Sequence, residues 1–349
     1  MDRSWSEILG TARCRVVAEP ALNPGRVPTV FGAPIQVAAS NLVDGHEHAW
    51  IAPQPGTAPD RAIDLSDVEL QAASLKDFAK AASKWWGHPT SGVVDPLDDR
   101  RVGLVDCQPP FAGREARRLA ELSQRSGVAI ACVTGFHLAR YYPDGKRPWG
   151  DEAAAADLFE REIELGLTEM PTQRAAAIKA AHSGTTFDDL AMWEAATEAQ
   201  RRTDACLLVH TERGAGVTEL LAWLVDQGVD TRRVYLCHMD KRPDIGLHRE
   251  LAQSGVLLGY DTFLRAKYEP DKHVWPLLLK MLELGFGDYV ALGLDLAGAD
   301  LWRSPCGGPS EFVTNVATRV ELEVSEVSVR SGILGANVVR RLARGLEEG

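Results

Sequence analysis

Short apolar runs rich in β-branched residues recur along the chain, and most are followed by a stretch with helical periodicity. Each run is apolar on both faces, which is typical of strands in a parallel sheet covered by helices. There are eight such runs: Leu42–His48, Val102–Gln108, Val128–His137, Ala175–His182, Ala205–Thr211, Arg233–Asp240, Val256–Phe263 and Tyr289–Leu296. Eight strand–helix units predict an α/β protein with a (β/α)8 TIM barrel.

The stretches between the runs carry apolar residues at intervals that place them on one face of a helix. An open, doubly wound sheet is the main alternative to a barrel. No G-x-G-x-x-G follows the first run, which disfavours a dinucleotide-binding version of that alternative. Helices are predicted over Arg114–Ser126, Thr186–Arg202, Gly216–Gln227, His248–Ser254 and Val274–Leu284.

The length of the chain suits a single barrel domain over residues 1–349. Residues 1–34 are expected to form a leader that packs on the barrel, with a short hairpin over one end. Two long connections, 49–101 and 138–174, follow strands and should therefore lie on the active-site face. Further helices are predicted over Leu65–Trp86, Ala153–Leu167 and, near the end of the chain, within Glu311–Leu346.

Charge and cysteine usage narrow the possible partners and location. The net charge of −11 disfavours nucleic acid and anionic membranes as partners. No apolar stretch is long enough to span a bilayer, and no signal peptide is visible. The six cysteines show no C-x-x-C spacing and most lie in apolar runs, which fits a reducing cytosol. We expect a cytoplasmic homodimer that acts on a small-molecule substrate.

Six polar residues interrupt five of the apolar runs at or near their carboxyl ends. Such residues are costly in a buried strand unless they are paired or ligated. A single polar residue of this kind is best explained as a core residue with hydrogen-bond partners. Six such residues at equivalent positions are not explained by independent coincidence. Barrel geometry would bring them together on one face. They are His46, His48, Lys179, His210, His238 and Asp295.

Four imidazoles and a carboxylate suit a borderline divalent ion such as zinc. They are too many for one catalytic ion with an open position, so we expect two ions. Lys179 is the unusual member, because a protonated amine beside two cations would be repelled. A neutral amine, in contrast, can take up CO₂ and become a carbamate, which is an anion able to bridge two metals.

The chain resembles the phosphotriesterase family of the amidohydrolase superfamily. The matching stretches include G-H-E-H, A-A-I-K-A, L-V-H-T-E, V-Y-L-C-H-M-D and I-L-G-A-N-V-V-R-R-L, within about residues 35–345. The resemblance implies that His46, His48 and Asp295 hold a more buried metal. It implies further that His210 and His238 hold a more exposed one, with carboxylated Lys179 and a hydroxide between them. Zinc is the expected ion, with manganese and cobalt as alternatives.

Such a centre predicts hydrolysis by the metal-bridging hydroxide, with Asp295 taking the proton and passing it to the leaving group. Phosphotriesters, lactones and amides are all possible substrates, so the loops must decide. Lys241, Arg265 and Tyr268 follow two strands and are read either as an anion-binding site or as solvated loop residues. The D-K and R-A-K-Y stretches are similar to those of family members that act on phosphorylated sugar lactones.

The favoured prediction is therefore a metal-dependent lactonase for a small phosphorylated or carboxylated sugar-type lactone. The alternatives are a phosphotriesterase (organophosphate esterase), an N-acyl amide hydrolase and a metal-containing binding protein without turnover. His137 and Tyr141 are candidates for substrate contact, although packing explains them equally well.

Several other residues carry weaker expectations. Asp106 is predicted to support a metal-bound histidine, and Asp261 to orient its loop or pair with Arg265. Trp302 is a candidate wall on the leaving-group side. Trp85 and Trp86 are read as packing or subunit-contact residues, and His88, His248 and His273 as surface residues.

Overall fold

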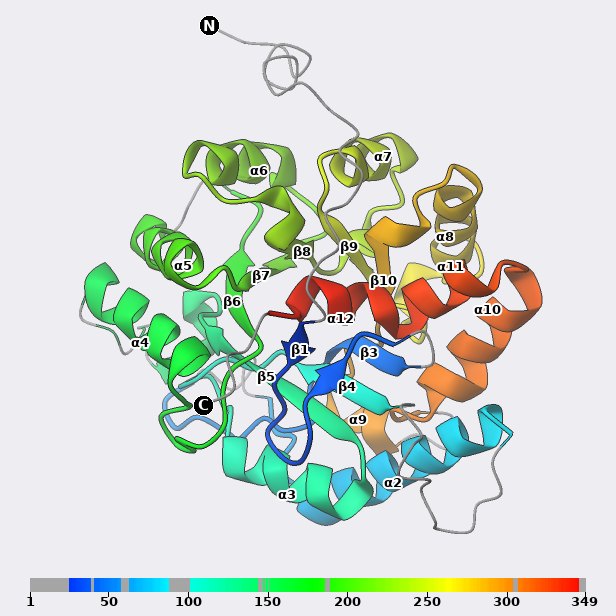
Figure 1. Cartoon of the computed structure of the whole chain (residues 1–349), viewed down its shortest axis with the longest axis horizontal. Helices are drawn as coiled ribbons and strands as arrows, with labels where there is room; N and C mark the ends of the chain where they lie inside the picture. The colour runs from blue at the N-terminus through cyan, green and yellow to red at the C-terminus, as the bar shows by residue number, and fades with distance from the viewer. Residues whose placement is uncertain are drawn as a thin grey trace, which may run out of the picture.

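The computed structural model shows a barrel of eight parallel strands surrounded by helices, so the predicted (β/α)8 TIM barrel is confirmed (Figure 1). The strands follow one another around the barrel in chain order, from β3 to β10. The structure describes residues 25–38, 41–57, 63–87, 101–143, 147, 149, 151–185, 189–303 and 307–344.

Every strand of the barrel falls inside one of the eight predicted apolar runs. The strands are nearly all buried on both faces, as expected for a parallel sheet covered by helices. Their bounds are β3 Leu42–Glu47, β4 Val102–Asp106, β5 Ala129–Gly135, β6 Ala177–His182, β7 Cys206–Thr211, β8 Val234–Leu236, β9 Leu257–Tyr260 and β10 Val290–Leu292.

Aspartates start four of the outer helices. The side chains of Asp67, Asp151, Asp189 and Asp244 each accept a hydrogen bond from a backbone N–H in the first turn, which satisfies a donor that the helix itself leaves unpaired. The helices are α2 Val68–Trp85, α3 Ala116–Ser126, α4 Glu152–Glu164, α5 Leu190–Thr203, α6 Val217–Asp226, α7 Ile245–Gln253, α8 Val274–Glu283, α9 Ala299–Arg303, α10 Thr318–Glu323, α11 Val327–Ser331 and α12 Asn337–Leu342.

The barrel closes where β3 meets β10, and this seam has no regular ladder between the two strands. The backbone N–H of Asp295 donates to the carbonyl of His46 at 2.9 Å. The N–H of Leu296 donates to the carboxylate of Glu47 at 2.8 Å. Gly293 allows this close approach, since a Cβ there would lie 2.9 Å from the backbone nitrogen of His46.

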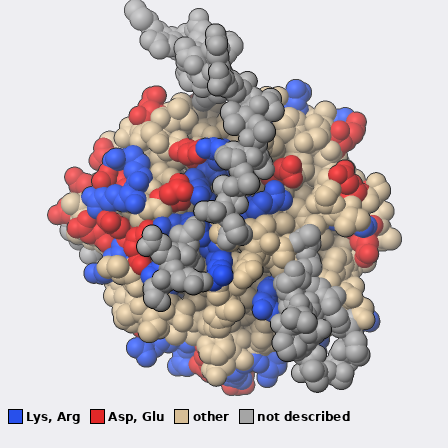
Figure 2. All heavy atoms as spheres, viewed as in Figure 1, with Lys and Arg blue, Asp and Glu red and all other residues tan. Residues whose placement is uncertain are grey.

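A small antiparallel hairpin covers the amino-terminal ends of the strands. It pairs β1 (Arg26–Val27) with β2 (Ile35–Gln36), and its apolar side chains join the inner barrel core. Helix α12 packs on the same end. Residues 1–24 of the predicted leader lie outside the described residues. Figure 2 views this end of the barrel and shows acidic and basic side chains interspersed around it. The carboxyl ends of the strands lie at the opposite end.

The structure corrects the prediction that His248 lies at the surface. Helix α7 begins at Ile245, so His248 is one turn further into the helix than predicted and faces the core. Its Nδ1 lies 2.6 Å from the hydroxyl of Tyr260, and its Nε2 lies 2.9 Å from the carbonyl of Arg242. His273 is exposed as predicted, and His88 lies outside the described residues.

The two neighbouring tryptophans at the end of α2 are half-buried. Trp85 and Trp86 pack against the main hydrophobic core, in agreement with the packing interpretation. In the described part of the chain, no helix has the length and apolar character that crossing a bilayer requires.

Candidate metal centre

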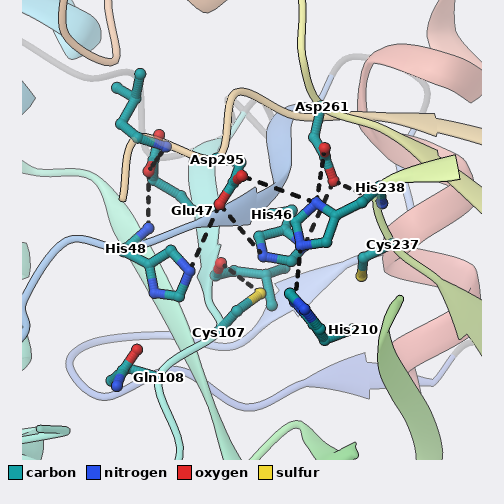
Figure 3. A network of polar contacts seen from close by, with 12 residues as sticks. His46, Glu47, His48, Cys107, Gln108, His210, Cys237, His238, Asp261 and Asp295 are labelled. Atoms are coloured by element: carbon teal, nitrogen blue, oxygen red, sulfur yellow. Dashed lines mark hydrogen bonds and ion pairs between the residues drawn. The ribbon is translucent and has the colours of Figure 1, made fainter. Parts of the chain in front are cut away.

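Five of the six predicted ligands stand at or just beyond the carboxyl ends of their strands, on the end of the barrel that the hairpin leaves open, and Lys179 lies within β6. His46, Lys179 and His210 lie on β3, β6 and β7. The other three follow β3, β8 and β10 directly or within a few residues. Figure 3 shows the four imidazoles and Asp295 turned toward one another.

Two groups of side chains are close enough to share a cation. One consists of His46, His48 and Asp295, and the other of His46, His238 and Asp261, with the possible ligand atoms in each group within 4.8 Å of one another. Burial holds the pKa of His46 well below its ordinary value, with the charge of Lys179 as the next cause. Burial also lowers the pKa of His48 to about 3. Both imidazoles are therefore neutral near pH 7, which is the form that binds metals.

Unpaired buried nitrogens in the site indicate bound metal ions independently of the family resemblance. Both ring nitrogens of His46, Nδ1 of His48 and Nζ of Lys179 are buried without a hydrogen-bond partner in the described structure. Buried polar atoms are normally paired, so several unpaired nitrogens in one place require an explanation. A divalent cation would take the lone pair of one His46 ring nitrogen, and a carboxylated Lys179 would turn the orphaned amine into an anionic ligand.

His238 is oriented by a buried carboxylate that the sequence reading assigned to a different role. Asp261 lies 2.8 Å from Nδ1 of His238 and accepts the backbone N–H of the same residue at 3.0 Å. It also lies 3.6 Å from Nδ1 of His46. Burial raises the pKa of Asp261 to about 7, against the influence of nearby Lys241. Where the sequence predicted that Asp261 orients its loop or pairs with Arg265, the structure shows it bonded to the ring and the backbone of His238.

His210 and His238 present one ring nitrogen each to the same point. Nδ1 of His210 and Nε2 of His238 are 3.0 Å apart. The opposite nitrogen of His210 lies 3.4 Å from the carboxylate of Glu212, as the opposite nitrogen of His238 lies beside Asp261. With the protons directed at carboxylates, the two inward nitrogens offer lone pairs that a cation would share.

Other buried carboxylates fix the backbone around the ligands. Asp44 accepts the N–H of His46 at 3.0 Å, and Glu47 accepts that of His48 at 2.7 Å. Asp106 was expected to support an imidazole; it instead accepts the backbone N–H of Ala49 at 2.7 Å. Asp106 therefore holds the turn that follows His48 rather than the ring itself.

The backbone adopts a left-handed conformation at two predicted ligands. The φ angles of His238 and Asp295 are 64° and 50°. Non-glycine residues in this region carry strain of order 1–3 kcal/mol and occur often at functional sites. At β5, Gly135 has φ 100°, and a Cβ there would lie 2.0 Å from the carbonyl oxygen of Lys179. Glycine is thus required for β5 to pack against the backbone that carries Lys179.

Lys241, Arg265 and Tyr268 come together at the rim of the site. Lys241 Nζ lies 3.6 Å and Arg265 3.3 Å from the same carboxylate oxygen of Asp295. Lys241 Nζ also lies 5.9 Å from the ring centroid of Tyr268. Although burial opposes it, His238, Lys241 and Arg265 hold the pKa of Asp295 well below its usual range. Asp295 is therefore an ionised carboxylate beside two cations.

His137 and Tyr141 lie on the opposite side of the mouth, and their rings are in tilted contact, with centroids 4.2 Å apart. Nδ1 of His137 accepts the N–H of Leu138 at 2.7 Å, so the proton of this ring is on Nε2. The ring centroid of His137 lies 5.0 Å from that of His210. Tyr141 also lines a small pocket with Ile51 and Gln108.

Trp302, the candidate wall on the leaving-group side, lies on α9 in the segment that follows β10. It is buried, and its indole N–H donates to the carbonyl of Leu296 at 2.9 Å. Its role is to hold the loop after β10.

Sequence reasoning missed Asp44, Glu47 and Glu212. Glu47 lies between two histidines of a strand, and so points to the other face, where nothing in the sequence predicts what it contacts. Glu212 carried a usable signal, because in L-V-H-T-E it follows His210 by two residues and shares its face of the strand.

A barrel with imidazoles, a lysine and a carboxylate gathered at its carboxyl-terminal end is the arrangement of a metal-dependent hydrolase. The chain belongs to the phosphotriesterase family, whose model matches residues 97–323. This confirms the resemblance found in the sequence and makes the protein a hydrolase of that family.

Individual relatives agree with this assignment. A phospho-furanose lactonase from Mycoplasmopsis synoviae is 25% identical over 297 residues, which are 80% of this chain and 78% of that protein. A phosphotriesterase homology protein from Mycobacterium tuberculosis is 27% identical over 289 residues, or 79% of this chain and 81% of that protein. The crystal structure of a lactonase from Listeria monocytogenes superposes with a TM-score of 0.76 at 20% identity, covering 93% of this chain and 100% of that one.

Proposed function

We propose that the protein is a metal-dependent lactonase that acts on a small sugar-type lactone carrying a phosphate or carboxylate. The observation that carries the proposal is the position of Lys241 and Arg265, which place two cations beside Asp295 at the rim of the candidate metal centre. The similarity to a phospho-furanose lactonase supports it. A neutral phosphotriester would gain nothing from this pair of cations.

We further propose that His46, His48 and Asp295 hold the more buried of two divalent ions, and that His210 and His238 hold the more exposed one. Carboxylated Lys179 would contribute a ligand to both. Zinc fits this donor set best, with manganese or cobalt as alternatives. When bound, such ions supply the Lewis acidity that polarises an ester carbonyl and makes water nucleophilic near neutral pH.

The protein's own side chains would then bind the substrate and move the proton. Asp295, which is ionised, would accept a proton from the attacking water and return it to the ring oxygen as the lactone opens. Lys241, Arg265 and Tyr268 would hold the anionic group of the substrate. Charge-assisted hydrogen bonds to this group fix the carbonyl relative to Asp295.

A substrate screen tests the proposal. Zinc- or manganese-loaded protein would be assayed with phosphorylated lactones, their dephosphorylated forms, aryl phosphotriesters and N-acyl amino acids. We expect the phosphorylated or carboxylated lactones to have the highest kcat/KM. Preference for a neutral aryl phosphotriester would overturn the proposal, and bound metal without hydrolysis of any of these substrates would identify a binding protein instead.

Substitution of the two cations isolates the anion site. Lys241→Ala and Arg265→Ala should each raise KM for an anionic lactone by about 10- to 100-fold, the effect of a lost hydrogen bond to a charged group. KM for the neutral lactone should change much less. Lys272→Ala is the matched control, because Lys272 is exposed and pairs with Glu269 outside the site. Equal effects on both lactones would remove the anion site from the proposal.

A further inference from the structure

His210 is held on its outer side by a carboxylate that no part of the proposed mechanism uses. Nε2 of His210 lies 3.4 Å from the Glu212 carboxylate, while Nδ1 lies 3.0 Å from Nε2 of His238. A carboxylate can only accept, so a hydrogen bond from His210 to Glu212 requires the ring proton on Nε2 and leaves the lone pair of Nδ1 facing the candidate metal centre.

Glu212 is in turn held by Arg140, with which it forms an ion pair. Arg140 belongs to the 3₁₀ turn Ala139–Tyr141 that follows β5, and Glu212 follows β7. The Arg140 guanidinium also lies 5.2 Å from the ring centroid of Tyr141. The Tyr141 ring contacts that of His137 in a tilted arrangement, and the centroid of the His137 ring is 5.0 Å from that of His210. The same turn therefore reaches His210 both through Glu212 and through His137.

We propose that Glu212, held by Arg140, is a positioning residue that sets the tautomer of His210 and thereby the affinity of the more exposed metal position. This inference rests on the proposed metal centre. The turn after β5, which also carries Tyr141 at the mouth of the site, becomes the element on which that metal position depends.

The solvent exposure of the side chains separates the expected effect on stability from the expected effect on metal binding. The Arg140 and Glu212 side chains are 40% and 39% exposed, so their ion pair contributes little to the stability of the fold. His210 is only 14% exposed and is part of the site. Removing a carboxylate that orients a ligating histidine typically weakens metal binding by about 10- to 100-fold. Glu212→Ala should therefore weaken metal binding without destabilising the metal-free protein.

Zinc competition with a chelator tests the affinity. Glu212→Ala should raise the dissociation constant of the weaker-bound zinc by about 10- to 100-fold and leave the tighter one within about threefold. Arg140→Ala should act in the same direction with a smaller effect. The double variant should resemble Glu212→Ala alone, because both residues act through one contact.

Glu198→Ala is the matched control. Glu198 is a partly exposed glutamate of α5 that pairs with Arg201 and Arg202, outside the site. It should leave both zinc affinities unchanged, while its effect on the melting temperature of the metal-free protein should match that of Glu212→Ala. If Glu212→Ala and Glu198→Ala bind zinc alike, or if Glu212→Ala weakens both zinc ions equally, the inference is wrong.

A second measurement separates this inference from the proposed function. Nitrogen-15 NMR of the imidazoles in the metal-free protein should show His210 with its proton on Nε2, and Glu212→Ala should shift the population toward the other tautomer. An unchanged tautomer would overturn the inference even if the enzyme binds zinc and opens lactones. Protein that binds no divalent ion would overturn the proposed function and the affinity claim, while the NMR shift still decides the tautomer.

Discussion

The two histidines assigned to the more exposed metal share one hydrogen-bonding scheme in two environments. His238 is backed by Asp261, which is fully buried, and His210 by Glu212, which is 39% exposed. Each carboxylate faces the ring nitrogen that points away from the site. The two pairs differ in their exposure to solvent. The electrostatic interaction between carboxylate and imidazole is several times stronger in a buried, low-dielectric environment than at the surface.

This difference divides the site into a part set by the fold and a part set by loops. Around His46 and His238 the backbone is fixed by buried carboxylates such as Asp44 and Asp261, and by left-handed φ at His238. Around His210 the contacts come from Glu212, which follows β7, and from the turn after β5 that holds Glu212. We expect changes in the buried part to cost both stability and metal binding, and changes at the rim to cost metal or substrate binding alone.

Asp295 lies between the buried histidines and the two cations at the rim, so its replacement should have the largest effect. Asp295→Asn should lower kcat by about 10²- to 10⁴-fold, the usual contribution of a general acid–base group. Asparagine tolerates the positive φ of this position, so the fold should be retained. The rate of lactone opening measures the effect. Glu283→Gln, on the exposed face of α8, is the control; a loss below tenfold in Asp295→Asn would show that another group moves the proton.

Removal of the metal should show that the two ions are released at different rates. During chelation we expect two phases of zinc release, because His210 is more exposed to solvent than His46. A bound ion at 100 times its Kd stabilises the folded state by about 2.7 kcal/mol, so the free energy of unfolding should fall by at least that amount. Urea unfolding with and without chelator measures this. A single release phase would argue that the two positions are equivalent.

Asp261→Asn should affect stability and metal binding together. The buried hydrogen bond to His238 is weakened, which costs about 1–3 kcal/mol in the free energy of unfolding of the metal-free protein. Zinc affinity should fall by about 10- to 100-fold. Unfolding curves and zinc titration give the two values. If Glu212→Ala destabilises the metal-free protein as much as Asp261→Asn does, the distinction between the two parts of the site fails.

The smallest effect is expected from a buried imidazole contact outside the site. Tyr260→Phe removes the hydroxyl that lies 2.6 Å from Nδ1 of His248, and should cost about 1 kcal/mol of stability. Zinc affinity and kcat/KM should not change, since His248 lies on α7 away from the ligands. If this variant lost zinc affinity, substitutions of buried residues outside the site would also weaken metal binding. The effect of Asp261→Asn could then not be assigned to its contact with His238.

The sequence predicted the barrel and the candidate ligands because both leave periodic signals. Eight apolar runs each contain a strand, and the six polar residues interrupt those runs at one end. The failures have a common cause in burial that the local pattern does not reveal. His248 was placed at the surface because its helix was started three residues late. Asp106 and Asp261 were visible as strand-end carboxylates, but their acceptor roles depend on which backbone N–H or imidazole lies opposite.

The position of the metal centre at the seam between β3 and β10 predicts that a bound ion also stabilises the closure of the barrel. His46 and His48 lie on one side of the seam and Asp295 on the other, while the only described backbone-to-backbone hydrogen bond between these segments joins Asp295 to His46. An ion held by all three would link the two strands across the seam, where no regular ladder joins them in the described residues. Amide hydrogen exchange at Asp295 and Leu296 should therefore slow on metal loading more than exchange within the regular ladder of β6 and β7.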